Sequence, residues 1–274
     1  MAGAPEVPLL KPPPFEYAAP DTVEDAVALL GDGGTVLAGG QSLVPLLNLR
    51  LAFPELVVDI NGVSDLDYLE AGDGPLRIGA LTRQVALERS DLVRDRWPLL
   101  WKAVRLVGHP QIRTRGTVGG SVAHADPAAE LPAALVALGA RLHLRSSAGA
   151  RTVEASGFFR GPLETAREQE ELLVEIEVPE QADGTGAGFA EHARTHGDFA
   201  TAGAAAVVAP GGRAGLALLG AGPAPVRAEG AERALADGAA AHEAAELAAR
   251  EVEGDHRRAL CTELARRAIE EALA

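Results

Sequence analysis

The chain has 274 residues, with 25 Lys and Arg against 39 Asp and Glu, so its net charge at pH 7 is −14. This acidic balance argues against a general nucleic-acid-binding protein, because such proteins gain affinity by neutralising phosphates with basic side chains. The single cysteine, Cys261, excludes an internal disulfide and an iron–sulfur cluster held by this chain alone. At roughly 100–200 residues per domain, the length predicts two domains.

The N-terminal residues do not resemble a secretory leader. The segment from Met1 to Glu6 lacks basic residues, and three prolines at 12–14 interrupt the chain soon after it. The most apolar stretch, 131–144, is short and contains Arg141 and His143, so we expect no membrane span. We therefore expect a cytoplasmic protein.

The first 180 residues alternate between short apolar runs and segments with helical spacing. A helix is expected to run to Leu30 from Asp21 or Thr22, either of which suits an N-cap. Further helices are expected over residues 81–90, 98–107 and 129–138, and strands over residues 35–38, 56–60, 76–80, 151–155 and 172–178.

A break in the pattern comes after residue 178. Pro179 and a glycine-rich stretch over 181–188 interrupt the chain, so we expect a boundary between two domains, 1–179 and 180–274. Beyond it, residues 202–208 and 214–220 predict a hairpin, and three helices close the chain. The last helix carries Cys261 in an apolar stripe, which is typical of core packing.

The first of two glycine motifs runs from Val36 to Asn48 as VLAGGQSLVPLLN. A short strand leads into Gly39 and Gly40, and helical spacing begins near Ser42. Glycines allow the backbone to approach a ligand closely, and a helix N-terminus offers unpaired N–H groups, a combination that suits phosphate. Taken alone, paired glycines are weak evidence for a phosphate site and are more typical of a tight turn. A Rossmann fingerprint is absent, because the segment from Gly31 to Val36 (GDGGTV) has Val36 where the third glycine would belong.

The second motif runs from Gln111 to Glu130 and again contains paired glycines, Gly119 and Gly120. Hydroxyl side chains flank them at Thr117 and Ser121, and a helix is expected after residues 126–127. We therefore expect the two glycine loops to bind the two phosphates of a dinucleotide from opposite sides. Backbone amides and hydroxyls are suited to this in an acidic chain.

Several segments together resemble one known family, the flavoprotein (medium) subunit of molybdenum hydroxylases, which includes aerobic carbon monoxide dehydrogenase and the bacterial-type xanthine dehydrogenases. The resemblance covers nearly the whole chain except its C-terminal helices. The matching segments occur in order, and they are residues 14–17, 38–43, 78–82, 109–113, 116–127, 158–161, 171–173, 197–200 and 222–227.

This resemblance implies an α+β fold. Its FAD-binding part would be of the vanillyl-alcohol-oxidase (PCMH) type, with subdomains of about 1–60 and 61–179, followed by a C-terminal α+β domain of the carbon monoxide dehydrogenase flavoprotein type over 180–274. The FAD pyrophosphate would lie between the two glycine motifs, Glu130 on the ribose side and Leu173 near the isoalloxazine. The implied FAD-binding residues are Ala38, Gly39, Gly40, Gln41, Ser42, Leu43, Thr117, Val118, Gly119, Gly120, Ser121, His124, Glu130 and Leu173.

The sequence departs from the family pattern after Phe189. The family usually has a lysine two residues later and an Arg–Arg pair before Gly-Asp, whereas this chain has Glu191 and the pair Arg194–Thr195. The family's lysine beside the cofactor therefore has no counterpart at this position.

Histidines offer two further interpretations. His192 and His196 have the spacing of a metal pair on a helix, but the glycines around them favour a strand or loop, so no metal is expected. His124 would serve either in proton exchange near the flavin or, as we favour, in structural hydrogen bonding.

The resemblance implies an FAD-containing electron-transfer subunit with no catalytic acid or base of its own. Electrons would arrive from 2Fe-2S clusters of a small partner subunit, after substrate oxidation in a large molybdopterin-binding subunit, and would leave FAD for a terminal acceptor. The expected assembly is a dimer of heterotrimers. Two alternatives stay open at this point: a self-sufficient FAD-dependent oxidoreductase on the same fold, and a non-catalytic FAD-binding sensor or assembly protein.

Overall fold

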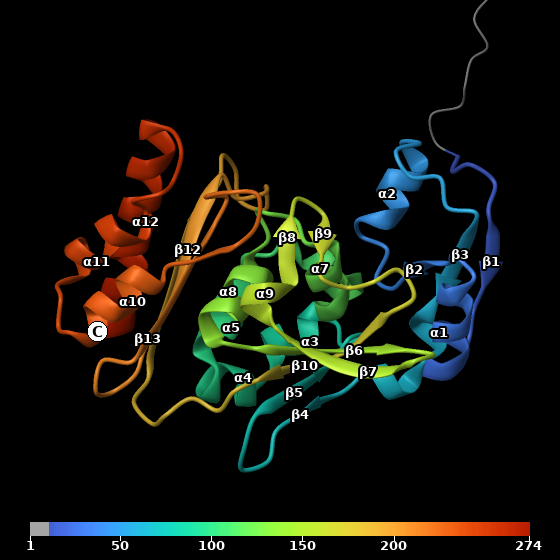
Figure 1. Cartoon of the computed structure of the whole chain (residues 1–274), viewed down its shortest axis with the longest axis horizontal. Helices are drawn as coiled ribbons and strands as arrows, with labels where there is room; N and C mark the ends of the chain where they lie inside the picture. The colour runs from blue at the N-terminus through green and yellow to red at the C-terminus, as the bar shows by residue number, and fades with distance from the viewer. Residues whose placement is uncertain (1–10) are drawn as a thin grey trace, which may run out of the picture.

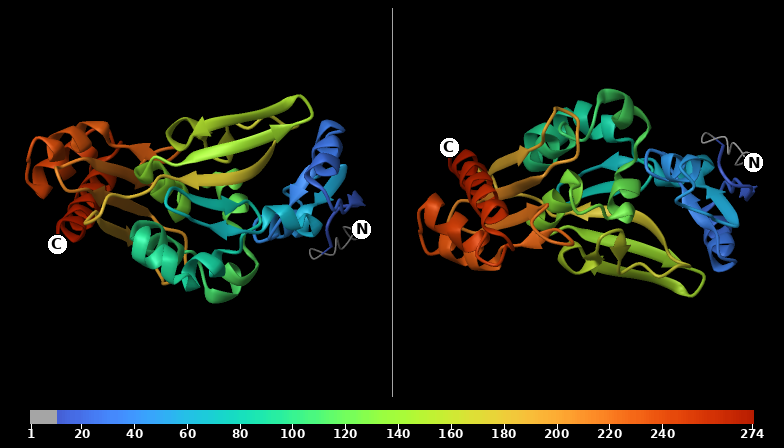
Figure 2. Two further views of the ribbon diagram at one scale, coloured as in Figure 1. Left: turned by 90° about the horizontal axis from the view of Figure 1, so that it is seen from below. Right: turned by 90° about the horizontal axis from the view of Figure 1, so that it is seen from above.

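The computed structural model describes residues 11–274, so the segment expected to lack a leader lies outside the described residues. The N-terminal elements and the C-terminal elements lie at opposite ends of the molecule, with the central elements between them (Figures 1 and 2). Within the described residues, no helix combines the length and the apolar character needed to cross a membrane.

The N-terminal part is a small parallel sheet. Its order is β1 (Glu16–Ala18), β3 (Leu56–Asp59), β2 (Thr35–Leu37), and helix α1 (Val23–Gly31) connects β1 to β2. Thr22 is the N-cap of α1, because its hydroxyl oxygen accepts the backbone N–H of Asp25 at 3.1 Å. Helix α2 (Leu43–Asn48) follows β2, and two 3₁₀ turns, η1 (Ile60–Gly62) and η2 (Ser64–Leu66), lead to the next sheet.

The central part is a five-stranded antiparallel sheet. Its order is β4 (Leu69–Glu70), β5 (Leu76–Gly79), β10 (Leu172–Val178), β6 (Arg141–Ser146), β7 (Gly149–Glu154). Helices α3, α5 and α8 lie over one face of it (Figure 1). The helices of this part are α3 (Gln84–Arg89), α4 (Asp91–Arg96), α5 (Pro98–Val104), α6 (Pro110–Arg115), α7 (Val118–His124), α8 (Glu130–Leu138) and α9 (Ala155–Phe158), and a short hairpin joins β8 (Phe159–Gly161) to β9 (Glu164–Thr165).

The C-terminal part is an antiparallel sheet between two layers of helices. Its strands are β11 (Gly186–His192), β12 (Ala202–Val208), β13 (Ala214–Leu219) and β14 (Val226–Arg227). Ala205 and Val207 of β12 belong to the core shared with α5 and α8. Ala204 and Ala206 pack in a second core with the helices α10 (Glu229–Ala236), α11 (Ala241–Ala248) and α12 (Asp255–Leu273). This burial of both faces explains why β12 is almost continuously apolar.

Two expected helices are shorter than their periodicity indicates. The helix expected over 81–90 spans only α3, and the one expected over 98–107 ends with α5 at Val104. Leu81 and Thr82 instead bond to the preceding chain: the Leu81 N–H donates to the Leu66 carbonyl, and the Thr82 hydroxyl donates to the Tyr68 carbonyl at 2.6 Å. Tertiary hydrogen bonds thus override the local pattern.

Candidate functional site

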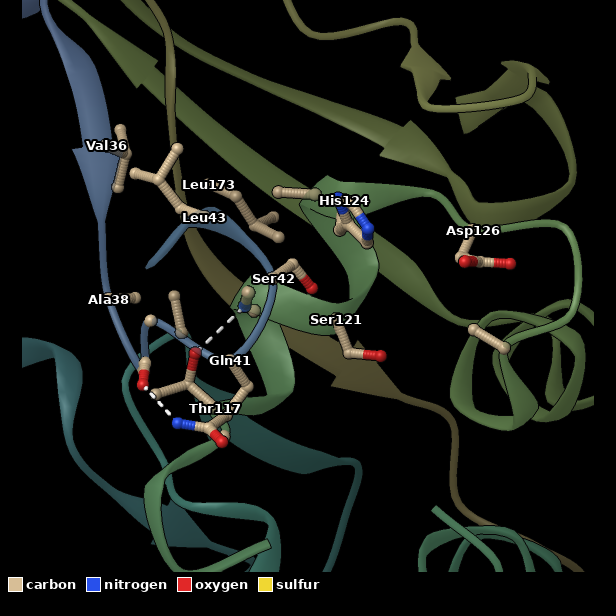
Figure 3. A pocket seen from close by; sticks show the side chains of 18 of the residues that line it. Val36, Ala38, Gln41, Ser42, Leu43, Thr117, Ser121, His124, Asp126 and Leu173 are labelled. Carbon is tan, nitrogen blue, oxygen red and sulfur yellow. Dashed lines mark hydrogen bonds between the residues drawn. The ribbon is translucent and has the colours of Figure 1, made fainter. Parts of the chain in front are cut away.

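A cavity of about 710 Å³ lies where the N-terminal sheet, the central part and a loop of the C-terminal part meet. Its walls include the segment after β2, helix α7, the segment leading into β10, and the loop at 197–199. This volume is within the range of ligand sites, roughly 300–1,000 Å³. Figure 3 shows side chains from the segment after β2, from helix α7 and from Leu173 facing a common space.

The first glycine motif forms an open loop with free amides. The backbone N–H groups from Gly39 to Leu43 have no hydrogen-bond acceptor among the described residues. Gly40 has a φ of +72°, a backbone conformation that favours glycine. The loop is held from within by the Gln41 side chain, whose Nε2 donates to the Gly39 carbonyl at 3.1 Å (Figure 3). A row of unpaired N–H groups lining a cavity is suited to bind an anion.

The second glycine motif is a helix, and the expectation of a second glycine loop is therefore wrong. Gly119 and Gly120 lie in the first turn of α7, whose N-cap is Thr117. Their amides are already bonded: the N–H of Gly119 donates to the Ala80 carbonyl, and that of Gly120 donates to Thr117 Oγ1, both at 3.0 Å. This segment therefore offers the cavity the Ser121 hydroxyl and a surface without side chains.

Two side chains, Arg83 and Asn61, connect the two motifs by hydrogen bonds without lining the cavity. Arg83 Nη1 donates to the Arg115 carbonyl, and Arg83 Nη2 donates to Asn61 Oδ1 at 2.7 Å. The Asn61 Nδ2 in turn donates to the Ala38 carbonyl at 2.8 Å. This chain of hydrogen bonds fixes the distance between the two glycine motifs.

The expected binding residues gather around this cavity with one exception. Val118 does not line it, because its side chain is fully buried in the core beneath. His124 lines it and makes no side-chain hydrogen bond to the described residues, so the structural hydrogen bonding that we favoured for this histidine is not seen. The expected residues that line the cavity are Ala38, Gly39, Gly40, Gln41, Ser42, Leu43, Thr117, Gly119, Gly120, Ser121, His124, Glu130 and Leu173.

Other parts of the wall were missed by the sequence motifs. Arg167 lines the cavity and shapes the turn that precedes β10, because its Nη1 donates to the carbonyls of Glu168, Gln169 and Glu171 at 2.9, 3.1 and 2.7 Å. Asp198 and Phe199 reach the cavity from the C-terminal part. A half-buried arginine in a polar turn gives no recognisable signal in a single sequence.

Glu130, which lines the cavity, and Glu191, which lies near it outside the cavity lining, both have carboxyl groups with raised pKa values. The pKa of Glu130 is raised to about 8, mainly by burial and also by the nearby Glu191 and Asp126, whereas the backbone N–H of Glu130 itself acts to lower it. Burial raises the pKa of Glu191 to about 7, and its Oε2 is buried without a partner among the described residues. Glu130 at the start of α8 thus faces an acidic residue on β11, with no cation among the groups that perturb either carboxyl.

The arrangement fits a dinucleotide of the FAD type. The free amides of the first loop can donate hydrogen bonds to a pyrophosphate, and the apolar side chains of Leu43 and Leu173 face the same cavity (Figure 3). The Ser42 and Ser121 hydroxyls approach it from different walls. When bound, FAD supplies redox chemistry, and this chain supplies binding, orientation and electrostatics.

Comparisons with known proteins identify the family of this chain. Residues 13–181 match the family described as the FAD binding domain in molybdopterin dehydrogenase. The chain is 42% identical over 254 residues, 89% of this chain and 86% of the relative, to 6-hydroxypseudooxynicotine dehydrogenase complex subunit alpha of Paenarthrobacter nicotinovorans. It is also 42% identical over 245 residues, 87% of this chain and 85% of the relative, to the carbon monoxide dehydrogenase medium chain of Hydrogenophaga pseudoflava.

The same relationship holds in three dimensions. A solved structure of carbon monoxide dehydrogenase from Hydrogenophaga pseudoflava superposes with a TM-score of 0.90 at 40% identity, covering 96% of this chain and 98% of that chain. The α+β fold expected from the sequence, with its FAD-binding part and C-terminal part, is thereby confirmed. The chain belongs to the family of FAD-binding subunits of the molybdopterin dehydrogenases.

Proposed function

We propose that this chain is the FAD-containing electron-transfer subunit of a molybdenum hydroxylase complex. It would receive electrons from the 2Fe-2S clusters of a small partner subunit, while a large molybdopterin-binding subunit oxidises the substrate. The observation that carries the proposal is the row of free amides from Gly39 to Leu43, which faces the Ser121 hydroxyl across one cavity. The single cysteine supports the division of labour, because the clusters need thiolates from another chain.

We further propose which residues touch the cofactor. The loop from Ala38 to Leu43 holds the pyrophosphate, Thr117 to Ser121 forms the opposing surface, and Glu130 and Leu173 contact the two ends of FAD. Val118 serves as a core residue that supports α7, because its side chain is buried. No side chain of this subunit is assigned as a catalytic acid or base.

We also infer that the complex works in the cytoplasm as a dimer of heterotrimers. Its substrate is chosen by the molybdenum subunit, and relatives named for carbon monoxide and for 6-hydroxypseudooxynicotine support this independence. Gentle purification from the native cell, with mass spectrometry of the co-purifying chains, tests the assembly. A large molybdopterin protein and a small iron–sulfur protein in equal amounts are expected. A chain that comes alone, carries FAD and turns over a substrate would instead favour the self-sufficient flavoenzyme.

The cofactor site is tested separately by Gly40→Asp and Gly120→Asp. Each variant introduces a side chain and a negative charge where the pyrophosphate is proposed to lie, so FAD retention should be lost. FAD is measured by absorbance after gel filtration, and folding by circular dichroism. A folded variant with an unchanged FAD content would refute the proposed position of the pyrophosphate.

A further inference from the structure

The outer face of the central sheet carries a polar cluster far from the glycine motifs in sequence. Ile176 and Val178 of β10 are buried in the core beneath the helices. Since side chains alternate along a strand, Glu175 and Glu177 face the other side. His143 of the neighbouring strand β6 pairs directly with Glu175 and shares that face. Helices α3, α5 and α8 lie on the opposite side of the sheet (Figure 1).

Only one of the two imidazole nitrogens of His143 has a hydrogen-bond partner among the described residues. Its Nδ1 lies 3.0 Å from Thr152 Oγ1 on strand β7. Its Nε2 is buried and has no hydrogen-bond partner among the described residues. This Nε2 lies 3.6 Å from Glu175 Oε1 and 3.4 Å from Glu177 Oε2. When Nδ1 carries the proton, it donates a hydrogen bond to Thr152 Oγ1. The unprotonated Nε2 then directs its lone pair towards the two carboxylate oxygens.

Each carboxylate keeps one free oxygen because its other oxygen is already bound. Glu175 Oε2 accepts the Tyr68 hydroxyl at 2.5 Å and the Arg77 guanidinium at 2.6 Å. Glu177 Oε1 accepts the Arg141 guanidinium. These partners orient the free oxygens in the way that outer hydrogen bonds orient ligands in metal sites. The three free atoms of His143, Glu175 and Glu177 all lie within 4.8 Å of one another.

We propose that His143, Glu175 and Glu177 bind one Zn²⁺ ion, with water completing the coordination. Tetrahedral ligands at about 2.0–2.1 Å from Zn²⁺ lie roughly 3.3–3.4 Å apart, close to the two separations around Nε2. One imidazole and two carboxylates are also donors that Zn²⁺ accepts, whereas Ca²⁺ takes six to eight oxygens. Arg77 and Arg141 contact only the far oxygens, but their charge opposes the ion, so we expect a dissociation constant of micromolar order.

The ion would join strands β6 and β10 across the sheet. Strand β10 begins with Leu172 and Leu173, which line the cofactor cavity. A bound ion would therefore stabilise the strand that forms this wall of the cavity. The proposal does not depend on the electron-transfer role, because metal binding is read out directly.

The test is isothermal titration of the chelator-treated, FAD-loaded full chain with ZnCl₂. We expect one site in the wild type that is lost in His143→Gln and in Glu177→Gln. Thr152→Val should weaken binding about 10–100-fold, because it removes the group that fixes the imidazole tautomer. The control is His242→Gln, which changes a histidine elsewhere, on helix α11, and should bind like the wild type. In the wild type, Co²⁺ should give the visible absorption of a tetrahedral site.

Two results would overturn the proposal. One is the absence of a site in the wild type, and the other is unchanged Zn²⁺ affinity and stoichiometry in His143→Gln. If a ligand variant does not fold, Thr152→Val and the Co²⁺ spectrum of the wild type still decide, because neither requires the loss of a ligand.

Discussion

Gly39 lies against the carbonyl group of Arg115, so that a Cβ atom on Gly39 would overlap the Arg115 oxygen and lie 2.9 Å from the Cα of Gly116. Gly39 belongs to the first glycine motif, and Arg115 lies within the second, shortly before its paired glycines. Glycine is therefore required at position 39 by the close approach of two backbone segments, which also sets the width of the cofactor cavity.

A first prediction concerns Gly39→Ala. The added methyl group pushes the two segments apart, so FAD affinity should fall at least about tenfold, and stability should also fall by about 1–3 kcal/mol. The matched control is Gly31→Ala at the end of α1, where a Cβ meets nothing within 4 Å. Affinity is measured by quenching of flavin fluorescence. Equal affinity in the two variants would contradict the role given to this contact.

A second prediction concerns Thr117, which caps α7. Its Oγ1 accepts the N–H of Gly120, and its side chain is almost completely buried. Thr117→Val removes this acceptor, so we expect a loss of about 1 kcal/mol in the free energy of unfolding and weaker FAD binding. Thr117→Ser keeps the hydroxyl and should restore most of both quantities in urea denaturation and FAD titration. If valine and serine behave alike, the cap is not what holds α7.

The third prediction is a pH dependence of stability from Glu130 and Glu191. Burial raises the folded-state pKa values to about 8 and about 7 from an ordinary value of 4.5. The folded chain then binds more protons than the unfolded chain between these limits, so stability is full below about pH 4.5 and is lost as the pH rises towards 8. Between pH 5 and pH 8, the free energy of unfolding should fall by on the order of 1–2 kcal/mol less in Glu130→Gln than in the wild type.

Urea denaturation of the FAD-free chain at several pH values measures this slope. Glu191→Gln should flatten it as well, and Glu191→Lys should lower the pKa of Glu130 by supplying an opposite charge. Glu180→Gln changes an exposed glutamate and serves as the control. A protonated Glu130 would be contradicted if the free energy of unfolding of the wild type rose between pH 5 and pH 8 and the Glu130→Gln variant showed the same pH dependence.

The fourth prediction concerns Arg113, which is 5% exposed. It donates two hydrogen bonds to Glu88, at 2.8 and 2.9 Å, and two more to the carbonyls of Val107 and Gly108, which line the cavity. Lysine keeps the charge but cannot make this fork of bonds, so Arg113→Lys should cost about 2–3 kcal/mol of stability. The exposed Arg115→Lys is the control, and thermal unfolding is the measurement. A change below about 0.5 kcal/mol would show that the fork contributes little.

Local patterns predicted much of the fold. The β2–loop–α2 unit around Gly39 and the hairpin of β12 and β13 were recognisable because strand periodicity and glycine turns coincide there. The N-cap at Thr22 was one of two expected candidates. The resemblance of several ordered segments then supplied the architecture and the cofactor, both of which are confirmed by the comparisons.

Tertiary contacts decided what the sequence did not reveal. Gly119 and Gly120 have low helix propensity, yet they lie in the first turn of α7, where the close contact of Gly119 with Ala80 leaves no room for a side chain. The walls formed by Arg167 and Phe199 come from segments that only the folded chain brings together. The cluster at His143 likewise depends on strand register, since β6 and β10 are distant in sequence.

The cavity walls have a consequence for how the chain unfolds. The N-terminal sheet has its own small core around Val27, Leu30 and Val58, separate from the larger core beneath α5 and α8. A bound cofactor would contact the loop after β2, helix α7 and residues 197–199, and would therefore stabilise the association of these units. Amides of residues 16–60 should then exchange with deuterium through a partial opening in the empty protein, and only through whole-chain opening once the cofactor is bound.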